Sequence, residues 1–191
     1  MAGKKKTNPS RIPAALSAEE AEQILEKAAR DMAIRVRAAF LGAVIDYDGT
    51  SAEELIHFLD NVGEYQADLR DPSSYTPVLS DIERKSGVHL PSHPLQETSV
   101  HSKKDAERFR RFAQENAAGA VFSAMLEPSE RIFGADKTPD ILRKANDICA
   151  EMEEGQISIP DIAWALETEF GLYLDVSGAR VRLRPVEMAA V

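Results

Sequence analysis

The residues best suited to chemistry are two aspartates, Asp46 and Asp48, which stand two positions apart after a hydrophobic run. Paired carboxylates can supply a nucleophile and a general acid or base, and they can hold a divalent cation. The same letters also suit a plain connection between helices, in which Asp48 and Gly49 form a turn and Thr50 or Ser51 caps the next helix. Both interpretations stay open at this point.

Residues 44–50, VIDYDGT, resemble the first signature of the haloacid dehalogenase-like phosphatases, a hydrophobic strand followed by Asp-x-Asp-Gly-Thr. The resemblance implies that Asp46 is the nucleophile that takes the phosphoryl group. It implies that Asp48 is the general acid/base and that both lie near a bound Mg²⁺. Residues 133–136, followed by Asp140, are loosely similar to the acidic metal-binding motif of that family.

The phosphatase resemblance also implies a doubly wound parallel sheet, whose buried strands read as runs of Val, Ile and Leu. After Thr50 no such run occurs until Leu172, which looks like part of a hairpin. The phosphatase is therefore our third hypothesis, with Asp46 and Asp48 as its catalytic residues.

Three histidines, His89, His93 and His101, are of the type that ligates zinc. They do not have the four-residue spacing of a helical pair, and Pro91 and Pro94 place them in a loop without a nearby cysteine. We expect no metal site here and no cofactor elsewhere.

Two clusters of cations could bind phosphate or an acidic partner. One alternates along the last expected strand, and the other occupies the first turns of a helix that begins near Ser102. The expected binding residues are Arg180, Arg182 and Arg184 in the strand, and Lys103, Lys104, Arg108 and Arg111 in the helix. The alternative for both is a solvated face, paired with neighbouring acids or protecting a sheet edge.

Hydrophobic residues recur at three- and four-residue steps along most of the chain, which indicates amphipathic helices. The first begins at a capping box formed by Ser17 and Glu20. The expected helices span residues 17–44, 51–62, 76–87, 102–126, 138–155 and 158–171. We expect the first and fourth of these to form the core.

Residues 138–184 are expected to fold as a helix, a turn, a helix and a two-stranded hairpin with a tight turn at Ser177-Gly178. This order resembles a winged helix-turn-helix. The residues expected to face inward in the hairpin are Leu172, Leu174, Val176, Ala179, Val181 and Leu183. The second helix carries Asp161, Glu167 and Glu169 but no lysine or arginine, so phosphate would be repelled and its face is expected to meet protein.

The net charge of −9 argues against a general nucleic-acid binder. A single cysteine, Cys149, is typical of a reducing, cytoplasmic setting, and no hydrophobic run suits a membrane span. Residues 1–16 carry Lys4, Lys5 and Lys6 without the hydrophobic run of a secretory signal, which indicates a flexible basic arm.

The sequence thus predicts a mainly α protein of about six helices with a C-terminal helix-turn-helix and β-hairpin unit. Its expected parts are the arm 1–16, a helical domain 17–134 and a winged-helix-like unit 135–191. The first hypothesis is a non-catalytic protein-interaction or assembly protein, of a type that suits a phage or mobile element. The second is a winged-helix nucleic-acid binder that uses the hairpin arginines.

Overall fold

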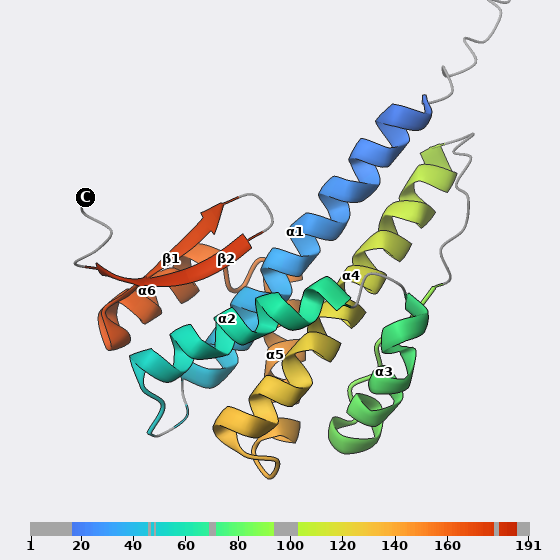
Figure 1. Cartoon of the computed structure of the whole chain (residues 1–191). Coiled ribbons are helices and arrows are strands. Elements are labelled where there is room, and N and C mark those ends of the chain that lie inside the picture. Colours follow the sequence, from blue (N-terminus) through green and yellow to red (C-terminus); the bar gives the residue numbers. More distant parts are fainter. Residues whose placement is uncertain are drawn as a thin grey trace, which may run out of the picture.

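The computed structural model describes residues 17–45, 47, 49–68, 72–93, 103–177 and 180–186. Within these ranges the chain forms six helices and one antiparallel hairpin, which confirms the mainly α fold (Figure 1). The elements are α1 (Ala18–Ile45), α2 (Ala52–Asp68), α3 (Pro72–Ser86), α4 (Lys103–Phe133), α5 (Thr138–Glu153), α6 (Ile159–Phe170), β1 (Leu172–Ser177) and β2 (Arg180–Pro185).

The centre of the molecule is the pair α1 and α4, which lie side by side and run in the same direction (Figure 1). Phe40 of α1 is fully buried and packs edge-to-face on Phe122 of α4, with ring centroids 5.0 Å apart. Phe58 of α2 lies 6.4 Å from Phe40 and 5.4 Å from Phe133. These aromatic contacts confirm that the first and fourth predicted helices build the core.

The C-terminal elements pack on this core, with α6 on α1 and the hairpin on α1 and α2. In the hairpin, β2 contacts α1 and α2, while β1 contacts α6. Leu172, Leu174, Val181 and Leu183 are buried in the same hydrophobic cluster as α1 and α4. The predicted boundary at residue 134 falls in the short α4–α5 connection, and hydrophobic side chains on both sides of it share one core.

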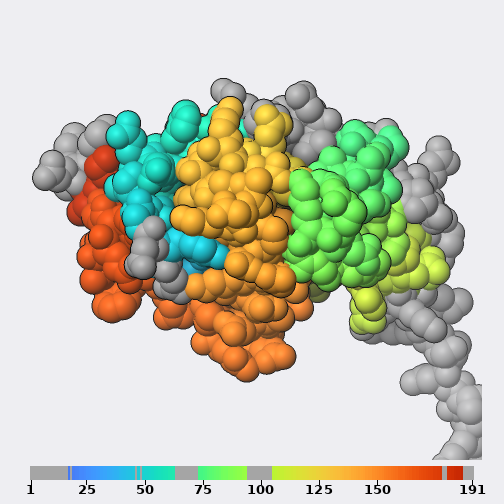
Figure 2. All heavy atoms as spheres, turned by 90° about the horizontal axis from the view of Figure 1, so that it is seen from below, coloured from blue at the N-terminus to red at the C-terminus, as the bar shows by residue number. Residues whose placement is uncertain are grey.

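The face seen in Figure 2 shows how the outer elements surround the centre. The C-terminal hairpin and α3 lie at opposite ends of this face, with the end of α4 and parts of α5 between them. The hairpin and α6 therefore form one end of the molecule, away from α3.

Three helices begin with a capping box, in which a serine N–H donates to a carboxylate three residues later at 2.8 Å. The pairs are Ser17–Glu20 in α1, Ser51–Glu54 in α2 and Ser158–Asp161 in α6. Serine hydrogen bonds stabilise the ionised form and lower the pKa of all three carboxyls. The predicted boxes at Ser17 and Ser158 are thus confirmed, and Ser51 rather than Thr50 caps α2.

Two predicted helix ends were wrong because local breakers did not stop the helix. The second helix continues past Gly63 to Asp68, and the fourth continues through Pro128 to Phe133. A glycine inside a helix costs about 1 kcal/mol and a proline about 3 kcal/mol. At Pro128 the surrounding turns are buried against α1 and α2, and this packing offsets the missing backbone hydrogen bond.

Three smaller expectations also need correction. The third helix begins at Pro72 instead of Thr76 and carries Pro77 inside it. Thr138 is the first residue of α5 instead of its cap, and its hydroxyl donates to the Gly134 carbonyl at 2.9 Å. Val176, expected inside the hairpin, is exposed although its cross-strand partner Val181 is buried, so at this end of the hairpin β2 is covered and β1 is not. The predicted turn residue Gly178 and the neighbouring Ala179 lie outside the described residues.

Candidate protein-docking surface on α6

The two candidate catalytic residues, Asp46 and Asp48, lie outside the described residues. The chain that leads to them does have a described conformation: Val44 and Ile45 form the last turn of α1. The phosphatase resemblance implies a strand at this point and a parallel sheet around it. Among the residues that the structure describes, the sheet is the antiparallel hairpin β1–β2, so the local setting differs from the implied one.

The histidines make separate contacts. His89 Nδ1 lies 3.1 Å from Glu83, whereas His93 Nε2 lies 2.5 Å from Glu115. The His93 ring also stacks on Phe112 with centroids 3.9 Å apart. The two contacts of His93 attach the segment after α3 to α4. His101 lies outside the described residues, and within the described ranges no three His, Cys, Asp or Glu side chains gather as a metal site would require.

The predicted basic cluster of α4 is partly neutralised by its own neighbours. Arg111 Nε lies 2.7 Å from the Glu115 carboxylate, and this hydrogen bond raises the pKa of Arg111. Arg108 lies over the Phe109 ring at 4.9 Å. The helix includes the backbone of Lys103 and Lys104, but their side chains fall outside the described part. Among the described cations of this region, Arg111 is therefore partly neutralised by Glu115.

The hairpin arginines lie where the alternation predicts. Arg180, Arg182 and Arg184 are all exposed on the outer face of β2. Arg184 pairs with Asp175 of β1 at 3.0 Å. The other two have no ion pair among the described residues, so the three arginines are not equivalent.

The most exposed large hydrophobic side chain in the described part of the chain is Trp164, on α6, at 69% of its full exposure. On the opposite side of the helix, Ile162 and Leu166 are buried in the main core, where α6 packs on α1. A tryptophan carries a large hydrophobic surface and an N–H donor, and it is enriched among residues that dominate binding interfaces. Its exposure here makes the outer face of α6 the strongest candidate surface.

Carboxylates surround this tryptophan on the helix. Asp161 and Glu167 are exposed one turn before and one turn after Trp164, and Glu169 is exposed near the helix end. The Ser158 hydroxyl and N–H donate to Asp161 at 2.5 and 2.8 Å and lower the pKa of that carboxyl, so it is ionised at neutral pH. No cation occurs between Ser158 and the end of α6. The outer face is thus a hydrophobic centre with an acidic rim.

The helix that carries this surface is held at both ends. The Ser158 capping box defines its start, and Gly171 ends it with φ 64°, a left-handed conformation that glycine adopts without strain. Between them, Ile162 packs closely on α1, where a Cβ added to Gly42 would lie 3.4 Å from Ile162 Cδ1. A preorganised helix loses little conformational entropy when a partner docks on it.

Sequence reasoning missed Trp164, although a signal for it exists. The predicted hydrophobic stripe of this helix runs through Ile162, Ala165, Leu166 and Phe170. At about 100° per residue, position 164 falls opposite the centre of that stripe. A large hydrophobic residue opposite a buried stripe is either covered by another element or exposed, and only the structure tells which.

Cys149 does not act as a ready nucleophile. It lies on α5, and burial raises the pKa of its thiol to about 12. The thiolate is the reactive form of cysteine, so a thiol with so high a pKa is inert near neutral pH.

None of the described helices is long and hydrophobic enough to cross a membrane. Comparison of the chain with protein-family models, with curated proteins and with solved structures gave no match.

Proposed function

We propose that this protein is a non-catalytic protein-interaction module that docks a partner through the outer face of α6. The observation that carries the proposal is Trp164, exposed at 69% on a rigidly held helix and surrounded by carboxylates. Exposing the hydrophobic surface of an indole to water costs free energy. Burying that surface against a partner removes this cost and favours binding.

The composition of the face indicates the chemistry of the partner. Asp161 and Glu167, one turn to either side of Trp164, repel phosphate, which disfavours a nucleic acid at this surface. The complement is a protein surface with a hydrophobic pocket for Trp164 and a rim of lysine or arginine. The rim charges are exposed, so they contribute more to association rate and specificity than to affinity.

The order of α5, α6 and the hairpin supports a winged-helix-like unit in which the second helix is the contact helix. In this proposal that helix contacts protein. The single half-buried thiol of Cys149 and the acidic composition support a cytoplasmic setting. A phage or mobile-element origin belongs to the same proposal and is supported only by the type of protein.

Affinity capture from the native lysate with nuclease added tests the docking face. The full chain, Trp164→Ala and Tyr173→Ala are compared. Tyr173 is the control because it is also an exposed aromatic of the C-terminal elements, at 49%, but lies on β1. The full chain and Tyr173→Ala should retain the same defined protein, and Trp164→Ala should lose it.

For a purified partner, truncation of Trp164 should weaken binding by about 2 kcal/mol or more, which is roughly thirtyfold. A partner that binds Trp164→Ala as tightly as it binds the parent protein would show that the docking face lies elsewhere.

A further inference from the structure

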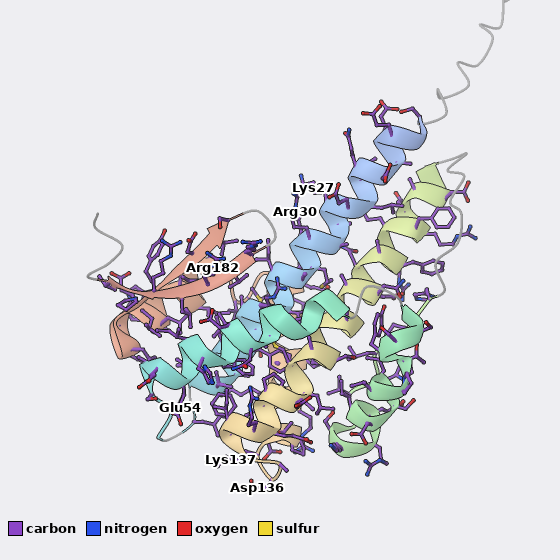
Figure 3. The ribbon with its side chains drawn as sticks, viewed as in Figure 1. Lys27, Arg30, Glu54, Asp136, Lys137 and Arg182 are labelled. Atoms are coloured by element: carbon purple, nitrogen blue, oxygen red, sulfur yellow. The ribbon has the colours of Figure 1, made fainter. Side chains whose placement is uncertain are left out.

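A second surface of opposite charge lies where α1 meets the hairpin. It consists of Lys27 and Arg30 on α1 and Arg180 and Arg182 on β2, all exposed. These pairs are about 150 residues apart in sequence, but α1 packs on β2. Figure 3 shows Lys27 and Arg30 on the flank of α1 that is turned toward the hairpin, where Arg182 lies. We call these four residues the α1–β2 patch.

The cations of the α1–β2 patch differ from most others in their pairing. Arg35 lies 3.1 Å from Glu153, Lys85 lies 2.5 Å from Glu130 and Arg184 lies 3.0 Å from Asp175. By contrast, none of the four patch residues has an ion pair with a described residue. Their charges are therefore available to a ligand.

The acidic groups around the patch offset its charge only in part. Glu26 and Asp31 are exposed on α1 without an ion pair to Lys27 or Arg30. Across the hairpin, Asp175 lies opposite Arg182 in the register, but its carboxylate pairs with Arg184. The patch therefore keeps a net positive charge on a protein whose total charge is −9.

We propose that the α1–β2 patch binds the phosphate backbone of a nucleic acid. Alternate residues of a strand project on one face about 7 Å apart, so Arg180 and Arg182 form a short row of guanidinium groups. Guanidinium groups bind phosphate through paired N–H donors, and Lys27 and Arg30 extend the row onto α1.

The net negative charge of the protein limits this binding to a weak, backbone-directed interaction without base readout. Such binding depends steeply on salt, because each neutralised phosphate releases a counterion. Four phosphates neutralised on duplex DNA correspond to a slope of about −3.6 in log K against log salt. Removal of one cation that binds a phosphate should lower the affinity at 50 mM salt roughly tenfold.

The test is fluorescence anisotropy of a labelled 20-base-pair DNA duplex of arbitrary sequence and of the corresponding single strand, titrated with the full chain between 50 and 200 mM salt. The double variant Arg30→Ala, Arg182→Ala should reduce affinity at 50 mM by about a hundredfold and should make the slope shallower by about 2. Circular dichroism and thermal unfolding confirm that each variant is folded.

The matched control is Arg84→Ala, Arg143→Ala, which removes two arginines from exposed positions on α3 and α5, where each pairs with an aspartate three residues before it. Its affinity should stay within about twofold of the parent protein, because a distant charge acts only through the screened field. Equal losses of affinity in both double variants, undiminished binding by the patch variant, or no binding to either DNA at 50 mM would each overturn the proposal. The proposal would also be overturned if the patch variant no longer captured an acidic protein but still bound DNA as tightly as the parent protein does.

The result is independent of the docking face on α6. Trp164→Ala should bind DNA as the parent protein does, since α6 contributes no residue to the patch. Failure of one proposal therefore leaves the other intact.

Discussion

The outer face of α6 and the outer face of the hairpin are neighbours in the chain but opposite in character. The α6 face presents Trp164 among carboxylates, whereas β2 presents a row of arginines. Both belong to the same small end of the molecule (Figure 1). The net charge of −9 does not predict the charge of either face. The charge of a face depends on which acidic and basic side chains lie close together on it. Surface function in this protein has to be assigned face by face.

The largest expected effect separates the two sides of α6. Leu166 is fully buried, so Leu166→Ala should lower the free energy of unfolding by about 2–5 kcal/mol. Trp164→Ala, which removes a far larger side chain, should change it by only about 0.5 kcal/mol or less, because that side chain packs on little. Urea denaturation measures both. A large loss of stability for Trp164→Ala would show that the indole is structural, and it would end the contrast between an open α6 face and a covered one.

The next effect concerns the helix end that supports the acidic rim. Ser158→Ala removes the cap of α6 and should lower stability by about 0.5–2 kcal/mol. The pKa of Asp161 is lowered in the folded state, so its stabilising effect is present above the unfolded pKa and is lost as pH falls through the folded pKa. Chemical denaturation of the parent protein and of Ser158→Ala, followed from pH 7 into the acid range below about pH 4, should show the two stabilities converging. A constant difference across this range would contradict the role of the box.

Quenching of tryptophan fluorescence by ions of opposite charge reports the sign of the charge around the indole. Trp164 is the single tryptophan of the chain, so its fluorescence reports on α6 alone. The acidic rim attracts cations, so caesium should quench the emission more strongly than iodide does at equal ionic strength, each relative to its quenching of a free tryptophan derivative. The preference should shrink in Glu167→Gln and at high salt, where charges are screened. Equal quenching by both ions, each relative to the free tryptophan derivative, would show that the rim does not act on the indole.

The smallest expected effect concerns the hairpin. Asp175→Asn removes the partner of Arg184 and should lower stability by about 0.2–1 kcal/mol, because the pair is partly exposed. Freeing Arg184 should also strengthen DNA binding and steepen its salt dependence by about one. The same denaturation and anisotropy measurements apply, with Ser177→Ala on the same strand as the control. Unchanged DNA binding would show that Arg184 stays outside the phosphate-binding row.

Local signals in the sequence predict much of the fold. The capping boxes at Ser17 and Ser158 and the helix end at Gly171 are confirmed, because these interactions act within a few residues. Pro128 misleads for the opposite reason. Its local penalty of about 3 kcal/mol is smaller than the packing energy of a buried helix, which depends on elements far away in sequence.

Only some properties of the candidate surfaces could be predicted from the sequence. The outward direction of Arg180, Arg182 and Arg184 follows from the alternation of a strand. The difference between them does not follow from alternation, since the register places Asp175 opposite Arg182 but its carboxylate pairs diagonally with Arg184. The pairing of Arg111 with Glu115 in α4 is by contrast a local signal, because the two residues lie four positions apart on one helix.

The sequence by itself determined the helices, the hairpin and the charge of each face, because periodicity and capping are properties of short segments. Only the tertiary structure decided which faces stay open. It left Trp164 uncovered and brought Lys27 and Arg30 beside β2 (Figure 3). The physical reason is that burial and ion pairing depend on the distance between elements, and that distance is set by the packing of the whole core.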